Sequence, residues 1–222
     1  YAFASLLLVL PAAAIAQDLM APPPPRSLAA PSDAGIANTI AEWNALRQTD
    51  ALPFASYARF LLAHPGWPGE ALLRKAAERA LRTDAEDPSL VASYFTRYTP
   101  ATATAALRHA EALDATGQRE AARAAARRAW TMGALSPDDE ARLTMRFAGT
   151  LTVADHDARM ERLLWSRVTP IAVRQIALTS AARQPLYGTR LSMQSRSPDA
   201  ASRLAMVGDA ARGDPGFLID RV

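Results

Sequence analysis

The acidic residues are the first candidates for chemistry, because two carboxylates, one of them with a raised pKa, can cleave a glycosidic bond. The glutamates are Glu42, Glu70, Glu78, Glu86, Glu111, Glu120, Glu140 and Glu161. All fall in or near predicted helices, and most have an arginine within one helical turn. Glu161, for example, precedes Arg162 and lies two residues after Arg159. This spacing indicates surface glutamates paired with arginines, and no acid held in a dry cleft.

The histidines are too few and too scattered to predict a metal site. His64 stands at a predicted helix end, His109 on a helix beside Glu111, and His156 on an apolar helix stripe, so we expect core or capping roles. The chain has no cysteine, no His-Glu-x-x-His, no Gly-rich phosphate loop and no Gly-x-Ser-x-Gly elbow. The sequence therefore predicts no catalytic residue, no metal site and no cofactor.

The segment from Gly117 to Trp165 is typical of three helices joined by two tight turns. Gly133 ends the first helix, and Ser136, followed by a proline, caps the second. Thr152 and Asp155 stand in capping-box positions at the start of the third, although the usual box has Glu or Gln in the second position. Short amphipathic helices are marginal alone, so we expect their stripes to pack on the helices next in sequence. These stripes are Ala122, Ala125, Ala126 and Ala129; Leu143 and Phe147; and His156, Met160, Leu163 and Leu164.

Similar punctuation recurs from Ser32 to the last residue. Helix starts are predicted at Ser32-Asp33, Pro53, Trp67-Pro68, Asp87-Pro88, Thr99-Pro100, Ser136-Pro137, Thr169-Pro170, Ser197-Pro198-Asp199 and Asp214-Pro215. Turn glycines are Gly66, Gly117, Gly133, Gly149, Gly188 and Gly213. Several starts are about 35 residues apart, a spacing typical of solenoids built from two-helix units. We therefore expect residues 33–222 to form an all-α domain, a right-handed α-superhelix of antiparallel helix pairs that resembles a tetratricopeptide array.

Apolar residues at helical spacing define the faces that would hold such helices together. One face is rich in aromatic residues, and two readings stay open for it: core packing between helix pairs, or a surface on which a sugar or a partner stacks. The faces comprise Ile36, Ile40, Trp43 and Leu46; Phe54, Tyr57, Phe60 and Leu61; Leu72, Leu73, Ala76, Ala77 and Ala80; and the aromatic-rich Leu90, Val91, Tyr94, Phe95 and Tyr98.

The N-terminal residues predict the compartment. Residues 1–16 combine a short apolar run with Ala14-Ile15-Ala16, an Ala-x-Ala cleavage pattern, and predict a signal peptide that lacks its charged leading region. Residues 17–32 contain four consecutive prolines and predict an extended, disordered linker. We therefore expect export, most simply to the periplasm of a Gram-negative bacterium, and no stable membrane span. We also expect the natural protein to begin before Tyr1.

Charge composition bears on the partners. The formal net charge is +3, and Lys75 is the only lysine among 25 basic residues. A nucleic-acid surface would need clustered basic residues interleaved with aromatics, and no such cluster occurs. We therefore expect a solvated helical surface with paired charges and no nucleic-acid partner.

Two stretches resemble a known family, the soluble lytic murein transglycosylases. Phe60-Leu61-Leu62-Ala63-His64-Pro65-Gly66-Trp67-Pro68 resembles its early superhelical segment. Residues 151–165 are similar to its L-T-x-x-D-H-x-x-R-M-x-x-L-L-W stretch, with Asp155, His156, Arg159, Met160 and Trp165 in the named positions. Arg127-Arg128-Ala129-Trp130 and Asp139-Glu140 also stand where the family's helices place such residues. The resemblance covers residues 32–222.

The resemblance implies a periplasmic protein whose N-terminal part is a U-shaped or ring-forming α-superhelix, followed by a lysozyme-like catalytic domain. The family cleaves the β-1,4 bond between N-acetylmuramic acid and N-acetylglucosamine, leaving a 1,6-anhydro sugar, with a glutamate in a Glu-Ser motif. This chain has no Glu-Ser pair, no Gly-Leu-Met-Gln and no Asn-Ala-Gly. We therefore expect a fragment truncated at both ends, inactive alone, in which Asp155, His156, Arg159 and Trp165 fix the helix stack.

Two functional hypotheses follow. In the first, these residues are the noncatalytic superhelical part of a peptidoglycan lytic transglycosylase, which holds the C-terminal catalytic domain in cis and restricts access of glycan strands. In the second, they form a periplasmic tetratricopeptide-like scaffold that binds a protein partner and catalyses nothing.

Overall fold

The computed structural model describes residues 33–82, 85–208 and 213–221. Within these ranges the chain is helical and has no strand, which confirms the all-α prediction. None of the described helices is long and apolar enough to cross a membrane. The predicted signal peptide at 1–16 and the linker at 17–32 lie outside the described residues.

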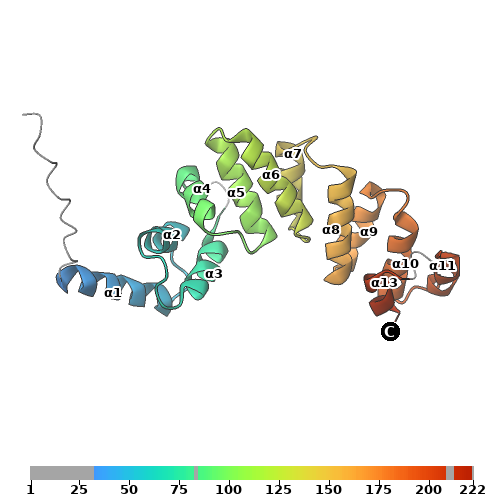
Figure 1. Cartoon of the computed structure of the whole chain (residues 1–222), viewed down its shortest axis with the longest axis horizontal. Helices are drawn as coiled ribbons and strands as arrows, with labels where there is room; N and C mark the ends of the chain where they lie inside the picture. Colours follow the sequence, from blue (N-terminus) through green and yellow to red (C-terminus); the bar gives the residue numbers. More distant parts are fainter. Residues whose placement is uncertain (1–32, 83–84, 209–212, 222) are drawn as a thin grey trace, which may run out of the picture. The chain divides into compact units, whose positions relative to one another are not determined.

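The helices follow one another with short connections (Figure 1). They are α1 Asp33–Gln48, α2 Phe54–Ala63, α3 Glu70–Ala80, α4 Pro88–Arg97, α5 Ala103–Ala115, α6 Arg119–Thr131, α7 Pro137–Arg146, α8 Val153–Trp165, α9 Thr169–Gln175, the 3-10 turn η1 Ile176–Leu178, α10 Gln184–Gln194, α11 Ala200–Met206 and α13 Pro215–Asp220. The chain divides into two units, Tyr1–Ala41 and Glu42–Val222, so the division falls inside α1. The candidate functional site lies in the second unit.

Side-chain caps begin several helices where the sequence predicts them. The Ser136 hydroxyl accepts a hydrogen bond from the Asp139 amide at 3.2 Å, so α7 starts with a cap and a proline. Thr152 and Asp155 form a reciprocal capping box at the start of α8. The turn glycines Gly133 and Gly149 adopt positive φ, at 117° and 74°. The three predicted helices between residues 117 and 165 are therefore confirmed.

Three predicted boundaries are wrong. The start at Trp67-Pro68 is displaced to Glu70, with Gly69 as the N-cap. The start at Thr99-Pro100 is displaced to Ala103, because the Thr102 hydroxyl accepts a hydrogen bond from the Ala105 amide and caps α5 there, while the Glu78 carboxylate of α3 accepts from the amides of Ala101 and Thr102. Gly188 lies inside α10 and not in a turn. A Cβ there would stand 3.1 Å from a guanidinium nitrogen of Arg203 in α11, the end of a half-exposed side chain.

One apolar cluster fills the space among α2 to α7. The aromatic-rich face of α4 belongs to it: Tyr94, Phe95 and Tyr98 are buried, and the Tyr98 hydroxyl donates to the Leu61 carbonyl at 2.9 Å. The core-packing reading of this face is therefore confirmed. Leu72, expected on the buried stripe of α3, is instead exposed, because Leu73, Ala76 and Ala77 already form the inward stripe and Leu72 lies about 100° round the helix from Leu73.

A second, smaller apolar cluster joins α8, α9 and α10, with Met160, Leu163, Leu164, Ala172 and Tyr187 as its buried members. Packing does not follow sequence order throughout. α5 and α6 lie side by side, but α6 then packs on α8, while α7 packs on α5 (Figure 1). The expectation that each stripe packs on the next helix in sequence is therefore wrong at α7. The right-handed superhelix stays a prediction.

Candidate functional site

The two apolar clusters meet across a set of polar contacts between α6–α7 and α8–α9, which we call the polar joint. It consists of the ion pair of Arg127 with Asp155, the contact of Trp130 with His156, and the pairing of Glu140 with both Arg159 and Arg174. Three of the five family-like positions of α8, Asp155, His156 and Arg159, lie in this joint.

Asp155 fixes the start of α8 and its distance from α6. Its carboxylate accepts from the Thr152 amide at 2.8 Å and takes two hydrogen bonds from the Arg127 guanidinium, at 2.9 and 3.0 Å. Burial alone would raise the pKa of Asp155, but the hydrogen bonds from Arg127 and Thr152 outweigh burial and hold that pKa below its ordinary value. The carboxylate is therefore ionised at neutral pH and acts as a structural anion.

Arg159 is the most buried charge of the joint. Its side chain is 1% exposed, and its guanidinium carbon lies 3.6 Å from the centre of the Trp130 ring. One guanidinium nitrogen binds the Glu140 carboxylate of α7, while Nε has no hydrogen-bond partner among the described residues. Burial lowers the pKa of Arg159, and Glu140 opposes that effect. An arginine stays charged in a protein, so Glu140 is its necessary counterion.

His156 links three helices as a hydrogen-bond acceptor. The Trp130 indole Nε1 lies 3.3 Å from His156 Nδ1, and the Gln175 amide nitrogen lies 3.2 Å from the same atom. An indole nitrogen only donates, so Nδ1 must accept and the imidazole must be neutral with its proton on Nε2. Burial first, and then the charge of Arg159, lower the pKa of His156, which agrees with the neutral form.

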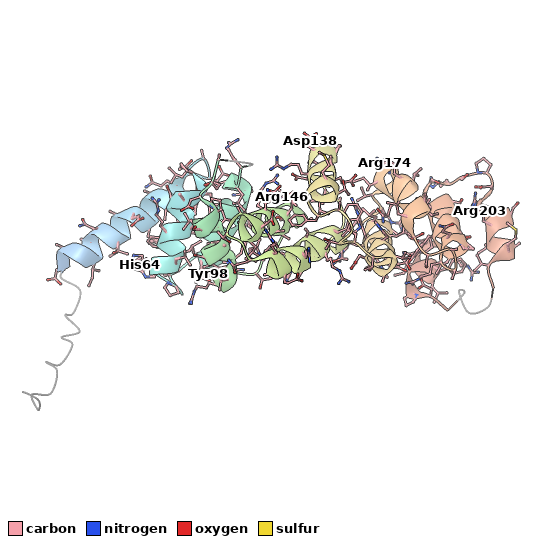
Figure 2. All side chains as sticks on the ribbon, turned by 90° about the horizontal axis from the view of Figure 1, so that it is seen from above. His64, Tyr98, Asp138, Arg146, Arg174 and Arg203 are labelled. Carbon is pink, nitrogen blue, oxygen red and sulfur yellow. The ribbon has the colours of Figure 1, made fainter. Side chains whose placement is uncertain are left out.

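A groove of about 610 Å³ opens beside the joint, between α7 and the α9–η1 segment. Arg174 extends from α9 at its edge, and Asp138 stands on the neighbouring α7 (Figure 2). Half of the lining residues are apolar, and the rest are charged, amide or hydroxyl residues. The lining residues are Trp130, Pro137, Glu140, Ala141, Thr144, Arg159, Ile171, Arg174, Gln175 and Leu178.

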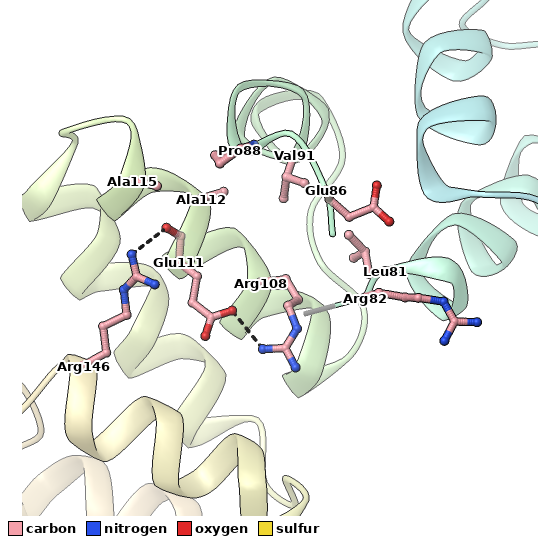
Figure 3. Close-up of a pocket in the computed structure, with 10 residues that line it drawn as sticks. All are labelled: Leu81, Arg82, Glu86, Pro88, Val91, Arg108, Glu111, Ala112, Ala115 and Arg146. Atoms are coloured by element: carbon pink, nitrogen blue, oxygen red, sulfur yellow. Dashed lines mark hydrogen bonds and ion pairs between the residues drawn. The ribbon is translucent and has the colours of Figure 1, made fainter. Parts of the chain in front are cut away.

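A second, smaller cavity of about 110 Å³ lies between α4 and α5 and contains two glutamates (Figure 3). Glu111 is buried, and its two carboxylate oxygens bind Arg108 at 2.9 Å and Arg142 at 3.0 Å. Burial raises the pKa of Glu86, which Arg82 partly opposes. The cavity holds only a few water molecules, so it is too small to place a sugar between the two acids.

The glutamates therefore need a correction. Glu111, Glu120, Glu140 and Glu161 pair with arginines, as predicted, whereas Glu70 and Glu78 accept hydrogen bonds from backbone amides. Glu111 is buried and Glu140 and Glu161 are mostly covered, so these three are not surface residues. Their arginine partners come from other helices as well as their own. Sequence spacing shows pairs within one turn and does not show pairs between helices.

The histidines and Trp165 take different places. His64 follows the last residue of α2, and its ring centre lies 4.9 Å from that of Phe60. The ring centre of His109 lies 5.2 Å from that of Phe95, and burial lowers the pKa of His109. Trp165 is half-exposed, and the guanidinium carbon of Arg190 in α10 lies 5.8 Å from its ring centre. Within the described ranges, no three acidic, histidine or cysteine side chains are grouped so that they could hold a metal ion.

Comparison with protein-family models, with curated proteins and with solved structures finds no match to this chain. The likeness to the soluble lytic murein transglycosylases therefore depends on the quoted residues alone. Sequence reasoning singled out Asp155, His156 and Arg159 but not the groove beside them. Trp130 and Glu140 were within the quoted stretches, whereas Arg174 and Gln175 carried no pattern that could have identified them.

Proposed function

We propose that this chain is the noncatalytic helical part of a periplasmic peptidoglycan lytic transglycosylase. The observation that supports this proposal best is the way α8 joins the helices around it. The stretch at residues 151–165 begins with a capping box, and its Asp155, His156 and Arg159 together join α6, α7 and α9. A stretch whose side chains tie three neighbouring helices together is what a scaffold needs.

In this proposal the helices hold a lysozyme-like catalytic domain, located elsewhere on the same polypeptide, and restrict which glycan strands reach it. Partner recognition would be electrostatic and peptide-directed. Peptidoglycan carries free carboxylates, and half-exposed arginines such as Arg123 and Arg174 offer guanidinium groups that bind carboxylates in a bidentate geometry. The proposal assigns no catalytic residue to this chain.

Cosedimentation with insoluble peptidoglycan sacculi tests the proposal. We expect the full chain to pellet with sacculi in a saturable, salt-sensitive manner, since exposed charge pairs weaken as salt rises. Cellulose particles serve as the control polymer, because they are glycans without carboxylates. The chain alone should release no soluble muropeptides.

The second candidate is a periplasmic scaffold that binds a protein partner. The arrangement of short helices with paired charges agrees with it equally well. Sedimentation with sacculi separates the two candidates when it is paired with capture from a periplasmic extract. A protein-binding scaffold would stay in the supernatant with sacculi and would retain a defined protein from the extract.

A further inference from the structure

The groove between α7 and the α9–η1 segment combines excess positive charge with a small apolar wall. Its charged lining residues are Arg159, Arg174 and Glu140, so two guanidinium groups share one carboxylate. The lining therefore carries one net positive charge. A ligand that brings one carboxylate would balance it.

The two arginines are held differently. Arg159 is buried and occupied by Glu140 and the Trp130 ring, and its Nε has no partner among the described residues. Arg174 is 58% exposed, and it reaches Glu140 at 3.4 Å and the Pro170 carbonyl at 3.2 Å. Both contacts are long for charge-assisted hydrogen bonds. Arg174 can therefore donate hydrogen bonds to a second carboxylate without breaking the buried ion pair of Arg159 with Glu140.

The apolar part of the groove limits what accompanies that carboxylate. Pro137 and Ala141 of α7 face Ile171 and Leu178 across the opening, a lining that fits methyl-sized side chains. A sugar fits less well, because sugar rings stack on open aromatic faces. The only lining aromatic, Trp130, is 3% exposed and already covered by Arg159. The volume, about 610 Å³, lies in the range of small-ligand sites.

We propose that this groove binds the C-terminal carboxylate of a short peptide with small apolar side chains, with Arg174 as the main contact. The inference deepens the proposed function and rests on it for the ligand's source: the groove would take the peptide stems of peptidoglycan and not its glycan. Arg174 positions the carboxylate, the α7 and η1 residues receive the side chains, and Glu140 remains on Arg159.

Isothermal titration of the full chain with N-acetyl-D-alanyl-D-alanine tests the groove, alongside the L,L isomer and the C-terminal amide. We expect saturable binding of the D,D acid and at least about tenfold weaker binding of its amide, because the lost charge-assisted contact is worth that much. Arg174→Gln should weaken the acid by a similar factor. Arg183→Gln is the matched control, since Arg183 is also about half-exposed and paired with a glutamate, but lies outside the groove, and should change the affinity less than twofold.

Equal affinity for acid and amide, no saturable binding of either acid, or an Arg174→Gln variant that binds like the natural chain would each overturn the inference. Preference for the D,D acid supports peptidoglycan as the source, and preference for the L,L acid supports a protein C-terminus. Failure of the groove is distinguishable from failure of the proposed function. If the chain is retained on sacculi but does not bind the dipeptide, the groove proposal fails and the proposed function stands. If the chain binds the dipeptide through its carboxylate but is not retained on sacculi, peptidoglycan is rejected as the source of the ligand and the groove stands.

Discussion

Removing the carboxylate of Glu140 should destabilise the molecule more than removing the buried arginine that it serves. In Glu140→Gln, the guanidinium of Arg159, 1% exposed, keeps its charge and loses its counterion. Breaking a buried ion pair from one side costs about 3–5 kcal/mol. The Glu140 side chain is 20% exposed and glutamine retains one acceptor oxygen, so we expect the lower end, about 3 kcal/mol.

The arginine side of the pair gives a smaller loss. Arg159→Met forfeits the ion pair and the contact over the Trp130 ring, about 2 kcal/mol together, but leaves no unpaired buried charge, because Glu140 keeps Arg174. The double variant, Glu140→Gln with Arg159→Met, should lose about 2 kcal/mol in all, which makes the coupling energy about 3 kcal/mol.

Urea unfolding followed by far-ultraviolet circular dichroism measures each free energy of unfolding, with the slope on denaturant checked for constancy. The control is Glu120→Gln, whose pair with Arg123 has side chains 86% and 56% exposed and should change stability by less than about 0.5 kcal/mol. A double variant that loses the sum of the two single losses would refute the reasoning that Glu140 exists to neutralise a buried charge.

Three further substitutions test contacts at α8 and between α10 and α13. Thr152→Ala removes the cap of α8 and should lower the free energy of unfolding by about 1 kcal/mol in urea titration; an unchanged value would contradict the capping box. Because burial lowers the pKa of His156 below its ordinary 6.5, the unfolded chain takes up this proton first as pH falls. Stability should therefore be full above about pH 6.5 and decline below it, and His156→Gln should show a smaller fall in Tm between pH 7.5 and 5.5; an equal fall would contradict the neutral imidazole. Gly216→Ala places a Cβ against the Arg190 guanidinium, which is itself buried, and should cost about 1–3 kcal/mol; a fully stable variant would mean that Arg190 is free to move.

Local chemistry in the sequence predicted the helices well, because the responsible bonds are local. Ser136 and Thr152 each bond a backbone amide three residues on, so the residue type and its spacing are enough to place the helix start. The aromatic face of α4 was likewise predicted from its helical period. The role of a residue whose contacts lie within one helical turn can be predicted from the sequence alone.

Contacts between helices could not be predicted in the same way. The Glu78 carboxylate of α3 accepts hydrogen bonds from the amide and the hydroxyl of Thr102 at the start of α5, and no residue type near position 100 predicts that contact. The groove likewise depends on how α7 and α9 pack around α8, which brings Arg174 to Glu140 from a helix 34 residues away. Periodicity shows that a helix has a buried face but not which helix covers it.

Binding to peptidoglycan is decided by the partition of the full chain between pellet and supernatant when it is mixed with purified sacculi. A transglycosylase scaffold should be retained saturably in the pellet, less so as salt rises, with no muropeptides released and no retention on cellulose. A chain that stays in the supernatant with sacculi while it captures a defined periplasmic protein would rule out this function and favour the protein-binding scaffold.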